Sequence, residues 1–269
     1  MLKLTALGDI CVDIYPSLDQ YFLGGTSYNF CLTASRLGTK TSLVSAVGQD
    51  DWGKKYLLAC KKQHINTDYL SVLPGKTSQV EIDLDSRHRP IFHGWQLGVL
   101  KSFRLNQSQL KFLTTQSVIR AICLKPLLPI FKQFCQLKTK AIKVADFAGG
   151  SIYSPSLSTI KTYFPFVDFI ITSQELTDST ALALLKQLAV KHHKLCLVTH
   201  GHQGSQVFTD KNNYFCPAQK IKSVDTTGAG DTYLANFLIS YYKTNNILAS
   251  MKIATQAAAK KITSFGASS

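Results

Sequence analysis

The stretch Ser223–Phe237, "SVDTTGAGDTYLANF", holds two acids and two glycines directly before an apolar helical pattern. Apolar residues then recur with helical spacing and predict a helix from about Asp231 to Tyr242: Leu234, Phe237, Leu238 and Tyr241. Glycines before a helix let the backbone approach a ligand, and the free N–H groups of the first turn attract phosphate oxygens. The stretch therefore predicts an anion-binding loop at a helix start.

The acid at this helix start, Asp231, has two interpretations. It stabilises the helix dipole, which contributes about 0.3–1 kcal/mol, or it accepts a proton from a hydroxyl that reacts beside a bound phosphate. Carboxylates are common at helix N-termini for the first reason alone. The position by itself leaves both interpretations open.

Short apolar runs alternate with helical patterns along the chain. Five runs that end near Gly, Ser or Asp predict buried strands: 3–8, 41–48, 141–147, 167–173 and 194–201. Helical patterns lie between them, for example at Ser27–Leu37 and Ser179–Lys191. This alternation predicts an α/β fold with a mainly parallel, doubly wound sheet and helices on both faces.

The segment Thr77–Trp95 breaks this rhythm. Its apolar residues alternate with polar ones, turn and resume, which predicts a hairpin with one wet face. A second extended stretch, Ile14–Leu23, is expected to pair with it. Because no repeat or linker interrupts the chain, we expect one domain over residues 1–269, with a small β lid at about 14–23 and 77–95.

Composition indicates a folded protein with a basic surface. The 269 residues are 45% hydrophobic and 17% charged, which excludes long disordered segments. The net charge of +14 favours an anionic partner, but lysines and arginines are scattered, without the interleaved aromatics of nucleic-acid binders. We therefore expect no nucleic-acid partner.

The N-terminal stretch and the cysteines indicate the compartment. Residues 1–15 lack the basic start and long apolar run of a secretory signal. The longest apolar stretch, Val118–Phe131, is 14 residues long and contains charged residues, so it does not span a bilayer. Seven cysteines stand singly, as in proteins with reduced thiols. We expect a cytoplasmic protein without a membrane partner.

The run "DTTGAGD", Asp225–Asp231, resembles the C-terminal signature of the PfkB-type, ribokinase-like carbohydrate kinases. Other segments resemble that family's motifs in the same order along nearly the whole chain: "GD" at Gly8-Asp9 with Asp13, "GGTSYN" at 24–29, "VTHGHQGS" at 198–205 and "ATQAAAKKI" at 254–262. The resemblance implies a ribokinase-like three-layer fold and an ATP-dependent sugar kinase.

The resemblance also implies roles for the matching residues. Asp231 is the expected general base, with an anion hole formed by the backbone N–H groups of Gly228, Ala229 and Gly230. The residues expected to hold sugar hydroxyls are Asp13, Gly25 and Asn29. Those expected to line the nucleotide are Thr199, Gly201 and Gly204, together with Gly228 and Gly230. Asp225 and Thr227 stand where many relatives bind a monovalent cation such as K⁺, and Mg²⁺ accompanies ATP through its phosphates.

One segment departs from the family pattern. Relatives carry an Asn-x-x-Glu motif after the strand at 167–173, and this chain has "SQEL", with Ser173 where Asn is expected and Glu175 out of step. The departure leaves the organisation of Mg²⁺ open. It also leaves open a second function, a sugar- or nucleotide-binding protein of this fold that does not catalyse transfer.

The substrate is indicated only by resemblance. "GDICVDIYPSLDQYFLGG" at 8–25, the serine at 173 and the end "FGASS" resemble most the branch that phosphorylates fructosamines such as fructoselysine at the 6-hydroxyl. In that case Glu81 and Asp83 on the lid are candidates to meet the substrate's amine; the alternative is that they are solvated strand positions. Fructose, ribose or a nucleoside remain alternative acceptors. The exposed lid edges favour a homodimer through the lid.

Overall fold

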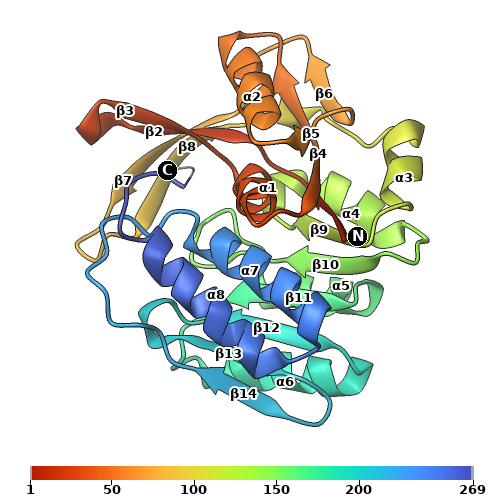
Figure 1. Cartoon of the computed structure of the whole chain (residues 1–269), viewed down its shortest axis with the longest axis vertical. Helices are drawn as coiled ribbons and strands as arrows, with labels where there is room; N and C mark the ends of the chain where they lie inside the picture. The colour runs from red at the N-terminus through yellow and green to blue at the C-terminus, as the bar shows by residue number, and fades with distance from the viewer. Residues whose placement is uncertain (1, 268–269) are drawn as a thin grey trace.

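A ten-stranded sheet forms the centre of the molecule in the computed structural model, which describes residues 2–267 (Figure 1). The strand order is β14-β13-β12-β11-β10-β9-β1-β4-β5, with β6 beside β4. The strands are β1 (Lys3–Leu7), β4 (Lys40–Gly48), β5 (Ile65–Asn66), β6 (Leu70–Leu73), β9 (Val118–Ile122), β10 (Ile142–Asp146), β11 (Phe169–Ser173), β12 (Leu195–Thr199), β13 (Ser205–Phe208) and β14 (Asn213–Cys216). Only the β12–β13 and β13–β14 pairings in this sheet are antiparallel. The predicted mainly parallel sheet is confirmed.

Helices cover both faces of this sheet. One face packs against α3 (Gln107–Leu113), α4 (Leu128–Gln136), α5 (Leu157–Tyr163) and α6 (Ser179–His192). The other packs against α1 (Thr26–Arg36), α2 (Asp51–Lys62), α7 (Ala229–Thr244) and α8 (Ile247–Lys261). Successive strand residues enter opposite cores, as Val144 and Ala145 do. The three-layer fold is therefore confirmed.

The five predicted strands are β1, β4, β10, β11 and β12, and the predicted helices are α1, α6 and α7. Helix α7 begins at Ala229, two residues before the predicted start, so two loop residues belong to its first turn. Strand β9 was not predicted. Its apolar run contains Arg120 and continues into a segment with two prolines, so it lacks a clear strand pattern.

The lid is a separate four-stranded sheet in the order β3-β2-β7-β8. Its strands are β2 (Cys11–Tyr15), β3 (Gln20–Gly24), β7 (Gln79–Leu84) and β8 (Pro90–Gln96). The hairpin expected at 77–95 is β7–β8, whereas the expected single stretch at 14–23 is most of a second hairpin with a short 3₁₀ turn at Pro16–Leu18. Within the part of the chain that the structure describes, no helix is long and apolar enough to cross a membrane.

The lid closes onto the loop that precedes α7. The carbonyl of His88, at the tip of the β7–β8 hairpin, accepts hydrogen bonds from the backbone N–H of Thr226 (3.1 Å) and from its hydroxyl (3.2 Å). From β2, the Tyr15 hydroxyl donates to Asp225 at 2.8 Å. These contacts join the two sheets around one cavity. The last two residues of the "FGASS" end lie outside the described residues.

Candidate active site

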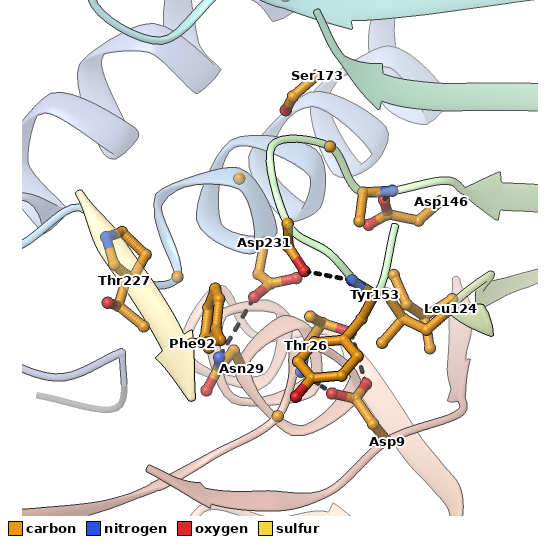
Figure 2. A pocket seen from close by; sticks show the side chains of 18 of the residues that line it. Asp9, Thr26, Asn29, Phe92, Leu124, Asp146, Tyr153, Ser173, Thr227 and Asp231 are labelled. Carbon is orange, nitrogen blue, oxygen red and sulfur yellow. Dashed lines mark hydrogen bonds between the residues drawn. The ribbon is translucent and has the colours of Figure 1, made fainter. Parts of the chain in front are cut away.

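A cavity of about 220 Å³ lies between the lid and the carboxyl ends of the parallel strands, with the start of α7 on one side. Figure 2 shows side chains pointing into it from the lid, the strand ends and two helices. Four of its lining residues are carboxylates, namely Asp9, Asp13, Asp146 and Asp231, and none of the lining residues is basic. The cavity therefore attracts cations, in contrast to the basic composition of the whole chain.

The glycine loop forms one wall of the cavity. Gly228 has a φ of +76°, and a Cβ there would lie 2.6 Å from the Ala267 side chain. This left-handed conformation starts α7, whose first-turn N–H groups have no partner within the helix. Gly228 and Gly230 line the cavity, whereas the Ala229 N–H donates to the Thr226 carbonyl at 3.2 Å. The loop thus presents backbone donors to the cavity from the two glycines.

Asp231 stands in the first turn of α7 and is 7% exposed. Its Oδ1 accepts from Arg120 Nη2 at 3.1 Å, and its Oδ2 accepts from Asn29 Nδ2 at 3.3 Å (Figure 2). Burial raises the pKa of Asp231 from 3.8 to about 8; Arg120 opposes this shift, and the charges of Asp146 and Asp9 add to it. A carboxylate with this pKa takes up a proton near neutral pH, which is what a general base needs.

The raised pKa predicts how pH changes stability. The folded protein holds this proton more tightly than the unfolded chain, so the carboxyl favours folding fully below the unfolded pKa and less as pH rises to about 8. We expect the Tm of Asp231→Asn to gain on the wild-type Tm between about pH 5 and about pH 8. Thermal melts at a series of pH values measure this difference. A difference that stays constant with pH contradicts the raised pKa.

Arg120, which the sequence analysis did not select, lies beneath the cavity and is fully buried. Its Nη2 contacts Asp146 Oδ2 at 2.5 Å as well as Asp231. An arginine inside an apolar run was the available signal, because a buried guanidinium requires anionic partners. Without the fold, nothing in the sequence indicated which acids those partners are.

The residues predicted to hold sugar hydroxyls come together at the lid side of the cavity. Asp13, Gly25 and Asn29 all line it. Gly25 has a φ of +87°, and a Cβ there would lie 2.7 Å from the backbone of Ile10 and Cys11. Asn29 Oδ1 is buried without a hydrogen-bond partner among the described residues. It is an unused acceptor, which a hydroxyl of a bound sugar would satisfy.

Asp13 is 4% exposed, and no hydrogen bond within residues 2–267 reaches its carboxylate. Burial, followed by the charges of Asp9, Asp225 and Asp231, raises the pKa of Asp13 well above its ordinary range. Such a group is costly to bury without partners. Hydroxyl donors from a ligand would supply them.

The expected lid acids do not face the cavity. On β7, Val80 lines the cavity and Ile82 is in the lid core, so strand alternation puts Glu81 and Asp83 on the opposite, exposed face. Asp83 pairs there with His93 at 3.3 Å. The structure thus favours the alternative given above, solvated strand positions, and corrects the placement of Glu81 at the substrate.

Only part of the expected nucleotide set borders this cavity. Thr199 lines it, and its Oγ1 lies 2.6 Å from the Ser173 hydroxyl, which also lines it. Gly201 (φ +55°) and Gly204 (φ +114°) form the tight turn between β12 and β13 and are not among the lining residues. Glu175 is exposed and lies outside the cavity lining. The "SQEL" departure therefore brings its serine, not its acid, to the site.

Asp225 does not fit a cation site in this arrangement. It is fully buried, and its two oxygens accept from Thr227 N (2.8 Å), Thr227 Oγ1 (2.6 Å), Tyr15 OH (2.8 Å) and Gly266 N (2.9 Å). These four donors fill the lone-pair positions of a carboxylate. Asp225 instead ties the glycine loop to the lid and to the C-terminal segment.

Monovalent cations are therefore expected to have little effect on catalysis. Replacing K⁺ by Na⁺ or by tetramethylammonium at constant ionic strength should change the turnover rate by less than about twofold, since Asp225 has no lone pair left for a cation. A coupled assay for ADP release measures this rate. An activation of tenfold or more by K⁺ would show that this carboxylate rearranges to bind it.

The chain itself offers no ready site for a divalent ion either. No group of three His, Cys, Asp or Glu side chains among the described residues is arranged to hold a metal. Mg²⁺ fits this site only as a companion of ATP, held by phosphate oxygens and water. All seven cysteines are buried free thiols, as the sequence indicated.

A glycine loop with a buried carboxylate, beneath a β lid at the carboxyl ends of a parallel sheet, defines a ribokinase-like small-molecule kinase. The sequence pattern of the "pfkB family carbohydrate kinase" matches residues 12–269, so the chain belongs to this family and is a sugar kinase. Kinases of this family use ATP with a divalent metal ion.

Individual relatives agree with this assignment. The fructoselysine 6-kinase of Escherichia coli (strain K12) is 26% identical over 268 residues, which cover 99% of this chain and 100% of the relative. The fructosamine kinase FrlD of Bacillus subtilis (strain 168) is 25% identical over 99% of this chain and 93% of its own. A crystal structure of fructokinase from Vibrio cholerae O395, in a form with fructose, ADP and calcium bound, superposes with a TM-score of 0.80 at 19% identity, covering 100% of this chain and 95% of that chain. This last similarity shows the fold alone.

Proposed function

We propose that the protein is an ATP-dependent kinase for fructosamines, the class that includes fructoselysine, and that it phosphorylates the sugar's 6-hydroxyl. The observation that carries this proposal is the charge of the cavity: four carboxylates line it, and no basic residue does. A fructosamine carries a protonated secondary amine, which fructose and ribose lack. The full-length similarity to a fructoselysine 6-kinase and a fructosamine kinase supports the same substrate class.

The amine has suitable neighbours in the cavity. Asp9 and Asp146 line it from the ends of β1 and β10, while Phe92, Trp95 and Tyr153 supply aromatic rings. The Trp95 ring is fixed, because its Nε1 donates to the Ser78 hydroxyl at 2.8 Å and its backbone N–H donates to the Tyr153 hydroxyl at 3.0 Å. A cation beside carboxylates and aromatic faces is stabilised by both.

The proposed reaction uses the chain's own groups in defined roles. Asp13 and Asn29 orient the sugar by accepting hydrogen bonds from its hydroxyls. Asp231 accepts the proton of the reacting hydroxyl while that oxygen forms its bond to the γ-phosphorus and the bond between this phosphorus and the β,γ-bridging oxygen breaks. The loop's backbone N–H groups at Gly228 and Gly230 stabilise the charge of the transferred group. Most of the rate gain in such a transfer comes from positioning and charge neutralisation.

A substrate panel tests the proposal. ADP release is measured with ATP, Mg²⁺ and one acceptor at a time: fructoselysine, fructoselysine acylated on its secondary amine, fructose, ribose and inosine. Fructoselysine should give the highest kcat/KM, and the acylated, neutral compound should lose at least about tenfold, because it forfeits a charge-assisted contact. Faster turnover of fructose, ribose or inosine would refute the substrate class. Binding without turnover of any acceptor would support the non-catalytic alternative. A homodimer through the lid edges β3 and β8 stays a prediction, and light scattering of the free protein tests it.

A further inference from the structure

The position of Arg120 in the sheet requires a reason. It is the third residue of β9, which lies between β1 and β10 at the middle of the main sheet. The other residues of β9 are apolar and buried. A guanidinium in such a place loses its hydration, and only well-placed anionic partners offset the cost.

The contacts of Arg120 lead to the active site. Its Nη1 donates to the hydroxyls of Thr26 (3.0 Å) and Ser27 (3.3 Å), in the first turn of α1. Its Nη2 alone serves two carboxylates on different elements, Asp146 at the end of β10 (2.5 Å) and Asp231 in α7 (3.1 Å). Its Nε has no hydrogen-bond partner among the described residues. The guanidinium is therefore placed for these contacts, and its donors are not all used.

We propose that Arg120 is a positioning residue that keeps Asp231 ionised and fixed for proton transfer, and that Asp146 competes with Asp231 for the same guanidinium nitrogen. This inference rests on the proposed role of Asp231 as the base. Arg120 does not line the cavity, so it acts on substrate only through Asp231.

The charges around Asp231 support this balance. Asp146 from β10 and Asp9 from the end of β1 raise its pKa, and Arg120 from β9 lowers it. Asp13 from β2 also interacts with Asp231, and Asn29 from α1 donates a neutral hydrogen bond. Arg120 is thus the single cation set against four carboxylates. Removing it should raise the pH at which Asp231 loses its proton, and removing Asp146 should lower that pH.

The test is the pH profile of kcat/KM for fructoselysine, or for whichever acceptor the panel identifies. Arg120→Met keeps much of the side-chain volume without charge and should move the acidic limb to higher pH by about one to three units, a tenfold loss per unit at pH values below the limb. Arg120→Lys keeps the charge and should restore most of the shift. Asp146→Asn should move the limb in the opposite direction. Arg104→Gln removes an exposed arginine distant from the cavity and serves as the matched control.

A merely structural role would give a different result. It would lower kcat/KM by the same factor at every pH and leave the position of the limb unchanged, which would overturn the proposal. Equal shifts for Arg120→Met and Arg120→Lys would also overturn it, because the charge would then not matter.

A second measurement does not need turnover. The Tm of Arg120→Met and of wild type is recorded against pH, each with and without Asp231→Asn. The pH range over which Asp231→Asn gains on its parent should extend to higher pH in the Arg120→Met background. If no acceptor of the panel is phosphorylated, the proposed function fails, and this titration still decides whether Arg120 sets the charge of Asp231. Identical ranges in both backgrounds refute the inference, whatever the enzyme's activity.

Discussion

Asp231→Asn is expected to lower kcat by roughly 10²–10⁴-fold, because the amide cannot accept the proton of the reacting hydroxyl. The substitution keeps the size of the side chain and an acceptor for Arg120, so the fold and the binding of both substrates should persist. The measurement is kcat and KM from ADP release, together with the Kd of sugar by calorimetry. A loss in kcat with an unchanged Kd identifies a group that acts in the transition state.

The chain offers a matched control for this prediction. Asp51 is also an acid in the first turn of a helix, α2, where it is exposed and pairs with Lys54 at 3.0 Å. Asp51→Asn removes the same interaction with a helix dipole and should leave kcat unchanged. If both variants lost activity to a similar extent, or if Asp231→Asn kept normal turnover, Asp231 would only stabilise its helix.

Asp13→Ala is expected to lower kcat/KM by roughly 10²–10³-fold, mainly through KM. The carboxylate has no partner of its own among residues 2–267 and lines the cavity, so we expect it to accept two sugar hydroxyls at about 1.5–3 kcal/mol each. The same substitution removes a carboxyl whose pKa burial raises well above its ordinary range. The Tm at pH 8 should therefore stay at or above the wild-type value.

Activity lost without a loss of stability separates a binding role from a structural one. Asp19→Asn provides the control, because Asp19 is exposed in the turn of the same lid hairpin. It has a φ of +49°, a conformation that asparagine adopts readily. A lower Tm for Asp13→Ala at pH 8 would show that Asp13 supports the lid, and an unchanged kcat/KM would exclude it from the sugar site.

The two errors of prediction in the site have separate physical causes. Glu81 was placed at the substrate because it lies on the lid, but a strand presents successive side chains to opposite faces, and Val80 occupies the inner one. Strand β9 was missed because a charged residue interrupts its apolar run. Its burial is tolerated only because two carboxylates meet it in the fold.

The chain's local features were predictable because they depend on neighbours in sequence. Glycines at 228 and 230 permit a phosphate-binding turn, the apolar spacing after Asp231 forms a helix, and alternating runs form a parallel sheet. Asp231 was accordingly identified as a candidate base before its surroundings were known.

Only the tertiary structure decided what surrounds that base. Arg120 lies 111 residues from Asp231 in sequence, and Asn29 lies 202 residues away. They meet because parallel strands deliver their carboxyl ends, and the helices that follow them, to one edge of the sheet. Burial at that edge makes each charge depend on the others, so the pKa of Asp231 and the roles of Arg120, Asp146 and Asp13 follow from packing that no local pattern contains.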